Sequence, residues 1–307
     1  MKYKKIHSTA LSISAVSLGT WVFGGDNWGQ VQEKNCIDAI TEALECGINL
    51  IDTAPIYGSG LSEEIVGKAI KGKRNKVILA TKCGLIGKGA GIKPNLNPDS
   101  IKKEIEQSLK RLQVDCIDIY QCHWPDPNTP IEKTMAELNN LKKQGKIKHI
   151  GVSNFGIDSL KKAAGFSDIV TLQSHYSLLE RSIEKDILPF CIEKGIGVIS
   201  YGSLGGGILS GKYKSPTKFS GPDARNFFYK YYDGDGFKKA SKTIALMQGI
   251  SAKIKRPLSQ IALNWIRQKQ SVVSAIVGCR NPEQAKANAL AGSWELSRED
   301  IDRLNAT

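Results

Sequence analysis

Short apolar stretches rich in β-branched residues alternate with longer amphipathic stretches along the whole chain. Continuous apolar runs of this kind are typical of strands that are buried on both faces, as in parallel sheets. They predict eight strands, over residues 15–18, 49–52, 77–80, 116–121, 149–152, 170–173, 197–200 and 275–277. Between them, apolar positions recur at helical spacing, which predicts helices over 33–46, 62–70, 98–112, 131–144, 157–164, 183–194, 236–254 and 258–267.

Local signals mark several helix ends. Ser62, followed by Glu63 and Glu64, predicts an N-cap with acidic side chains at the positive end of the helix. Pro98 suits the first turn of the next helix. Glycines that would favour left-handed C-caps follow three predicted helices, at Gly47, Gly145 and Gly195.

The order of these elements predicts an α/β fold. Eight strand–helix units without a break in composition indicate one closed (β/α)8 TIM barrel, a single domain over residues 1–307. The alternative is an open doubly wound sheet, which the absence of a GxGxxG turn after the first strand disfavours. Residues 5–14 are predicted to form a β-hairpin at the barrel bottom. Two long irregular stretches, 84–97 and 202–235, follow strand ends on the face where such barrels carry their active sites.

Composition narrows the function classes. The net charge of +13 comes from lysines spread over predicted helix faces, and no nucleic-acid-binding motif accompanies them, so no nucleic-acid partner is expected. No apolar run reaches the roughly 20 residues of a membrane span, and no signal peptide is recognisable. The seven cysteines are odd in number and lack CxxC spacing, which argues against disulfides and zinc and predicts a cytoplasmic protein.

Four ionisable residues come together at the predicted active face. Asp52 ends the second strand, Tyr57 lies in the loop after it, Lys82 ends the third strand, and His123 follows the fourth. Each residue alone would suggest a cap, a packing residue or a solvated charge. Their occurrence at successive strand ends favours chemistry instead.

This set suits protonation of a carbonyl oxygen. A phenol has a pKa of about 10, and a neighbouring ammonium such as Lys82 is expected to lower the pKa of Tyr57. Asp52 would keep the lysine charged, and His123 would orient the carbonyl by a hydrogen bond.

Four motifs carry a resemblance to a known family. They are GINLIDTAPIYGSGLSE at 47–63, ATK at 80–82, HWP at 123–125 and IGVSNF at 150–155. Together they closely resemble the signatures of bacterial NADP-dependent aldo/keto reductases, in the family's order and over residues 18–288. The resemblance implies a catalytic tetrad of Asp52, Tyr57, Lys82 and His123, with Tyr57 as general acid, and reduction of an aldehyde or ketone to an alcohol.

The resemblance also implies a nicotinamide cofactor across the barrel mouth. Ser153, Asn154 and Gln173 would hold the carboxamide, and Tyr201 would stack on the nicotinamide ring. The implied contact residues are Thr20, Trp21, Asp52, Ser153, Asn154, Gln173, Tyr201, Gly202, Leu204, Gly207, Lys212, Gly278, Arg280, Gln284 and Asn288. Without the resemblance, Ser153 and Asn154 could equally cap the next helix. Family members often have proline where Gly202 and Ser203 stand, which puts the contacts of this loop in question.

Arg280 carries the predicted cofactor preference. It precedes Pro282 at the start of a short helix, whose N-terminus favours anions. By resemblance Arg280 would pair with a 2′-phosphate, which favours NADPH over NADH.

Other readings remain beside this one. The barrel could be a cofactor-sensing regulatory subunit with little turnover. A metal-dependent hydrolase is disfavoured, because the four histidines show no paired ligand spacing, and no metal site is predicted. Cys83 and Cys122 flank the tetrad, where packing is favoured over a redox role.

The expected partner is a small-molecule carbonyl substrate. Its identity would be set by the loops 24–29, 84–97 and 225–235. Their aromatic side chains suit either apolar or sugar-like compounds, and the possible walls are Trp21, Trp28, Trp124, Phe227, Phe228 and Tyr229.

Overall fold

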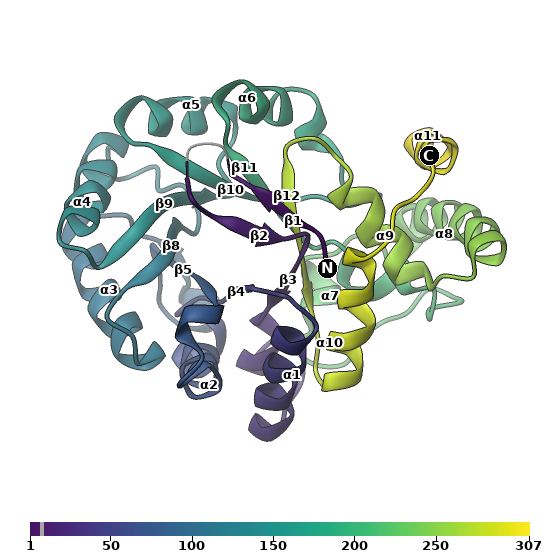
Figure 1. Cartoon of the computed structure of the whole chain (residues 1–307), viewed down its shortest axis with the longest axis horizontal. Coiled ribbons are helices and arrows are strands. Elements are labelled where there is room, and N and C mark those ends of the chain that lie inside the picture. Colours follow the sequence, from purple (N-terminus) through teal and green to yellow (C-terminus); the bar gives the residue numbers. More distant parts are fainter. Residues whose placement is uncertain (7–8) are drawn as a thin grey trace.

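Eight parallel strands close into a barrel, and helices surround it (Figure 1). The computed structural model describes residues 1–6 and 9–307. In order around the barrel the strands are β3 (Val16–Gly19), β4 (Leu50–Asp52), β5 (Ile78–Cys83), β8 (Ile117–Cys122), β9 (Ile147–Ser153), β10 (Ile169–His175), β11 (Gly197–Tyr201) and β12 (Val272–Gly278). All eight predicted strands are present. The closure of β12 onto β3 confirms the TIM barrel and excludes the open sheet.

The helices that follow the strands form the outer layer. They are α1 (Glu33–Glu45), α2 (Leu61–Ile70), α3 (Pro98–Leu112), α4 (Ile131–Lys143), α5 (Ile157–Phe166), α6 (Ile187–Lys194), α8 (Gly234–Ile254) and α9 (Leu258–Arg267). The described residues also form the helices α7 (Ala224–Phe227), α10 (Pro282–Ala289) and α11 (Arg298–Asn305). In the described residues, no helix combines the length and the apolar character of a membrane span.

Two predicted helix starts are wrong. The helix expected over 183–194 is divided into a 3-10 turn at Ser182–Glu184 and α6, which begins at Ile187. Pro189 lacks an N–H and fits only the first turn of a helix, so a continuous helix through it is disfavoured. In α2, Gly60 with φ 104° occupies the N-cap position, and the Ser62 hydroxyl makes no capping bond.

The predicted glycine C-caps and the Pro98 start are confirmed. Gly47, Gly145 and Gly195 have φ values of 86°, 75° and 68°. Pro98 opens α3, and the Asn97 side chain accepts a hydrogen bond from the Asp99 backbone N–H.

A β-hairpin covers the end of the barrel at which the strands begin. Strand β1 (Tyr3–Lys5) pairs with β2 (Ser12–Ser14), so the hairpin starts slightly earlier than predicted, and His7 and Ser8 lie outside the described residues. Ile6 and Ile13 are buried with interior residues of the barrel such as Leu50 and Ile119. Because this end is filled by apolar side chains, a ligand can enter only at the other end.

The two long stretches at the open end carry short elements. Residues 84–97 contain the antiparallel pair β6 (Leu85–Ile86) and β7 (Lys93–Pro94). Residues 202–235 contain a 3-10 segment at Gly205–Ser210 and the helix α7. These loops are therefore less irregular than the sequence indicates.

Candidate functional site

A cavity of about 1300 Å³ lies at the open end of the barrel. Most of the predicted site residues line it: Trp21, Asp52, Tyr57, His123, Ser153, Asn154, Gln173, Tyr201, Gly202, Leu204, Gly207, Lys212, Gly278, Arg280, Gln284 and Asn288. Two do not. Lys82 lies behind Asp52 and Tyr57, and Thr20 is buried below the cavity.

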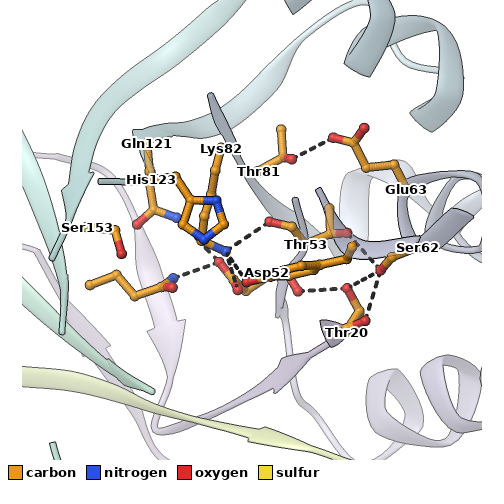
Figure 2. A network of polar contacts seen from close by, with 12 residues as sticks. Thr20, Asp52, Thr53, Ser62, Glu63, Thr81, Lys82, Gln121, His123 and Ser153 are labelled. Carbon is orange, nitrogen blue, oxygen red and sulfur yellow. Dashed lines mark hydrogen bonds and ion pairs between the residues drawn. The ribbon is translucent and has the colours of Figure 1, made fainter. Parts of the chain in front are cut away.

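Lys82 is the centre of a buried polar network (Figure 2). Its ammonium is fully buried and donates hydrogen bonds to Asp52 Oδ2 at 2.7 Å, to the Thr53 carbonyl oxygen at 3.0 Å and to Tyr57 Oη at 3.2 Å. Lys82 and Asp52 both point into the barrel from neighbouring strands. Two residues that are 30 positions apart in the sequence are thus in direct contact, and the ion pair offsets the desolvation of each charge.

The loop that carries Tyr57 is fixed by a close backbone approach. Gly58 has φ 63°, and a Cβ at this position would lie 2.6 Å from the Gly24 carbonyl oxygen. Only glycine fits there, so the loop after β4 packs directly on the loop after β3. The Tyr57 ring then stacks near Trp21, at 6.1 Å between centroids, and meets the His123 ring edge-on at 5.9 Å.

Thr20 and Ser62 brace this loop. The Thr20 hydroxyl donates to the Asp52 carbonyl oxygen at 2.9 Å, and Ser62 Oγ donates to Thr20 Oγ1 at 2.7 Å (Figure 2). The Thr20 side chain is buried and engaged by Asp52 and Ser62, and the predicted contact of Thr20 with a cofactor stays a prediction. Ser62 turns inward to the same network, which is why it does not cap α2.

The pKa values follow from burial. Burial first, and the Asp52 carboxylate second, raise the pKa of Tyr57 well above its ordinary value of 10.0. This reverses the expectation that Lys82 would lower it, because the lysine charge is largely compensated by Asp52 at 2.7 Å. Burial lowers the pKa of Lys82, and contact with Asp52 opposes that shift. Burial and then Lys82 hold the pKa of His123 well below 6.5, so its imidazole is neutral at pH 7.

Asp52 has two further donors. Gln173 Nε2 donates to Asp52 Oδ1 at 2.7 Å, and Gln121 Nε2 donates to the same oxygen at 3.3 Å. Gln121 was not predicted from the sequence. The alternation of side chains along β8 places Gln121 inward with Ile119 and His123, and this was the only signal that could have indicated it.

The rim of β9, β10 and β11 offers groups for a planar amide and a ring. Asn154 donates to the His123 carbonyl oxygen at 3.0 Å and accepts from Tyr201 Oη at 2.7 Å. The His175 ring stacks on the Tyr201 ring, with 5.3 Å between the ring centroids and 15° between the ring planes. Helix α5 begins after Gly156 with no side-chain cap, so Ser153 and Asn154 do not cap it.

The rim after β11 and β12 offers groups for an anion. Arg280 donates from its guanidinium to the Trp28 carbonyl oxygen, and its backbone N–H donates to Gln284 Oε1 at 2.9 Å. Asn281 caps α10 by accepting from the Gln284 N–H. With Lys212 and the positive-φ Gly207 nearby on the cavity wall, this donor set fits a diphosphate and a further phosphate.

Cys83 and Cys122 lie beside the tetrad but outside the cavity. They are register partners on β5 and β8, both are buried, and burial raises the pKa of the Cys83 thiol well above its ordinary value. A buried thiol of raised pKa is poorly reactive, which agrees with the packing role.

Comparison with known proteins decides the family. The model of the Aldo/keto reductase family matches residues 15–307. The chain belongs to this family. It is therefore an enzyme of the oxidoreductase class.

Relatives cover nearly the whole chain. It is 41% identical to aldo-keto reductase YhdN of Bacillus subtilis, over 99% of this chain and 93% of that protein. It is 36% identical to the NADH-specific methylglyoxal reductase of Escherichia coli, over 98% of this chain and 96% of that protein.

Solved structures agree. The glycerol dehydrogenase of Gluconobacter oxydans superposes with a TM-score of 0.91 at 36% identity, covering 99% of this chain and 94% of the other. The structure of an aldo-keto reductase of Klebsiella pneumoniae in complex with NADPH superposes with a TM-score of 0.76 at 26% identity, covering 96% of this chain and 91% of the other.

Proposed function

We propose that this aldo/keto reductase reduces an aldehyde or ketone to an alcohol with NADPH, using Tyr57 as the proton donor. One observation carries the proposal: the buried Lys82 ammonium donates to both Asp52 and Tyr57, at 2.7 and 3.2 Å, and these two residues line the cavity in front of it. This is an arrangement for holding a protonated phenol beside a bound carbonyl, with a charge in place to receive the phenolate that forms.

Each residue of the set has a defined part. Tyr57 remains protonated at neutral pH because its pKa is raised, so a proton is always present to transfer to the carbonyl oxygen. The Lys82 ammonium stabilises the resulting phenolate, which regains its proton from solvent. A neutral His123 donates an N–H to the carbonyl oxygen and fixes its direction, since its lowered pKa removes the imidazolium form. The reduced nicotinamide, when bound, supplies the hydride.

The cofactor assignment uses the polar rim of β9–β12. Ser153, Asn154 and Gln173 would hold the carboxamide, and Tyr201 would stack on the ring, supported from behind by His175. The name of one relative includes NADPH and that of another specifies NADH. The proposed preference of the enzyme for NADPH over NADH rests on Arg280, whose side chain lines the cavity close to the start of α10.

The test compares wild type with Tyr57→Phe. Purified wild-type protein is expected to oxidise NADPH in the presence of simple aldehydes. The phenylalanine variant should bind NADPH with unchanged affinity, measured by fluorescence, and lose about 10²- to 10⁴-fold in kcat. Wild-type protein that binds NADPH but turns over no carbonyl compound would instead favour the regulatory-subunit reading.

A further inference from the structure

A buried carboxylate lies on the outer side of the barrel wall, behind the strand that carries Lys82. Glu63 is in the first turn of α2 and is fully buried. Its Oε1 accepts a hydrogen bond from Thr81 Oγ1 at 2.6 Å, and Thr81 immediately precedes Lys82 on β5 (Figure 2). Because side chains alternate along a strand, Thr81 points outward to α2 while Lys82 points into the barrel. The carboxylate is thus bonded to the strand residue next to the lysine of the proton-transfer centre.

The second oxygen of the Glu63 carboxylate is held by α3. Arg111 Nε donates to Glu63 Oε2 at 2.7 Å, and Ser108 Oγ donates to the same oxygen at 3.3 Å. Helix α3 lies close against α2 at this point, since a Cβ at Gly67 would be 2.7 Å from the Arg111 carbonyl oxygen. With donors on both oxygens, from β5 and from α3, the carboxylate is fixed in one orientation.

Arg111 connects the same carboxylate to the loop that carries Tyr57. A Cβ at Gly60 would lie 2.7 Å from Arg111 Cδ, so the arginine side chain covers the backbone three residues after Tyr57. Gly60 has φ 104°, a conformation that favours glycine and permits this close approach. The Gly58 contact described above holds the first part of the loop, and Glu63, through Arg111, holds the part that leads into α2.

Titratable groups lie around Lys82 on both sides of its strand. Those inside the barrel are Asp52, Tyr57 and His123. Those on the outer side are Glu63, Arg111, Glu104, Tyr120 and the thiols of Cys83 and Cys122. Burial lowers the pKa of Lys82, and the carboxylates of Asp52 and Glu63 raise it. Since Arg111 is paired with Glu63, loss of the Glu63 charge would leave an uncompensated cation behind the lysine.

We infer that Glu63 is a positioning residue of the reductase: it fixes the Tyr57 loop relative to the strand of Lys82, and its charge helps to keep the Lys82 ammonium protonated. Glu63 does not line the cavity, so it acts through these two residues and not on the substrate or the cofactor. The inference rests on the proposed function, because it concerns the same proton-transfer centre.

Two variants with opposite changes of charge test this role. Glu63→Gln keeps the size of the side chain but leaves the Arg111 cation unpaired, so the alkaline limb of kcat/KM that Lys82 sets should move to lower pH by about one unit. Arg111→Gln leaves the carboxylate without its cation, so the limb should move to higher pH. A role limited to the stability of the fold would lower kcat/KM in both variants without opposite displacements of the limb.

Two further variants separate the hydrogen bond from the charge. Thr81→Val removes the donor to Glu63 without changing any charge, so kcat should fall about three- to tenfold with the limb in place and the Kd for NADPH unchanged. Glu106→Gln is the matched control for the loss of a carboxylate, because Glu106 is exposed on α3 and paired with Lys146. It should leave both kcat and the limb unchanged.

NMR titration of the Lys82 ammonium needs no turnover. The Lys82 Cε resonance of lysine-labelled protein is assigned by its absence in Lys82→Met, and its midpoint should fall in Glu63→Gln and rise in Arg111→Gln. If Glu63→Gln does not fold, Arg111→Gln carries the same test with the opposite sign. Midpoints equal to that of wild type would overturn the inference while the reductase assignment stood. Absence of turnover with every carbonyl compound would instead remove the proposed function, and the midpoints would still decide whether Glu63 supports the lysine charge.

Discussion

Gln173 and Asp52 are joined by a 2.7 Å hydrogen bond, in which the amide nitrogen of Gln173 donates to the carboxylate that also holds Lys82. The bond fixes the orientation of the Gln173 amide, so its oxygen is the atom left to accept from a ligand. One carboxylate thus positions both the lysine behind the proton donor and an amide on the proposed cofactor rim.

Gln173→Leu should accordingly affect cofactor binding and turnover together. We expect the Kd for NADPH to rise about tenfold, because one buried hydrogen bond to the ligand is lost, together with a fall in kcat. Gln121→Leu is the matched control, since Gln121 donates to the same Asp52 oxygen at 3.3 Å but does not line the cavity. It should lower kcat with little change in Kd. Equal changes in Kd for the two variants would contradict the proposed difference.

Arg280→Ala tests the cofactor preference. Loss of a charge-assisted bond to a 2′-phosphate should raise the Kd for NADPH about 10- to 100-fold and leave that for NADH nearly unchanged. Lys286→Ala, which removes an exposed cation on the adjoining helix α10, serves as the control for a general loss of positive charge. Parallel losses for NADPH and NADH would argue against the phosphate contact.

The pH dependence of reduction should have no acidic limb near neutrality. His123 is held neutral by its lowered pKa, and Tyr57 is held protonated by its raised pKa, so neither changes state between about pH 6 and about pH 8. Activity should fall only at alkaline pH, where Lys82, whose pKa is lowered, loses its proton before Tyr57 does. The pH profile of kcat/KM measures this. An acidic limb centred near pH 6.5 would contradict the prediction, because it would show that His123 titrates with the ordinary pKa of an imidazole.

Glu104 should make the protein less stable as pH rises. This buried carboxylate on α3 accepts from the Gly84 N–H at 2.9 Å, and burial raises its pKa from 4.5 to about 7. The folded state therefore binds the proton more strongly, and the stability it contributes below pH 4.5 is lost as pH rises through 7. The loss is on the order of 3 kcal/mol.

Denaturant unfolding of Glu104→Gln checks this. The free energy of unfolding of the variant minus that of wild type should become more positive between about pH 5 and about pH 8. The size of this difference at the lower pH does not affect the prediction. Glu106→Gln, on the same helix but with an exposed carboxylate paired to Lys146, should show no such trend. A difference between Glu104→Gln and wild type that does not vary with pH would contradict the prediction.

The barrel could be predicted from the sequence because each strand and helix signals itself locally. The strands are continuous apolar runs, and the helices between them keep their period, so the order alone indicates closure. The meeting of Asp52, Tyr57, Lys82 and His123 could be expected for the same reason, since parallel strands end at one rim.

What the sequence did not reveal depends on side-chain direction and burial. Ser62 has the pattern of an N-cap, yet it turns toward Thr20, because a buried hydroxyl partner was available there. The pKa of Tyr57 was expected to fall because a lysine is near, but the sequence does not show how deeply the phenol is buried, and burial is the first cause of the raised pKa, followed by the Asp52 carboxylate. Gln121 resembles any other polar residue until the barrel interior is in place.

The loop between β5 and α3 has ends that meet. Asn95 N–H donates to the Gly84 carbonyl oxygen at 3.0 Å, and β6 pairs with β7 just above that bond. The segment is thus a closed module anchored directly after Lys82 and Cys83, and its tip can differ in length or composition without shifting the strand that precedes it. Exchange of this module between relatives offers a route to new substrate ranges on an unaltered proton-transfer centre.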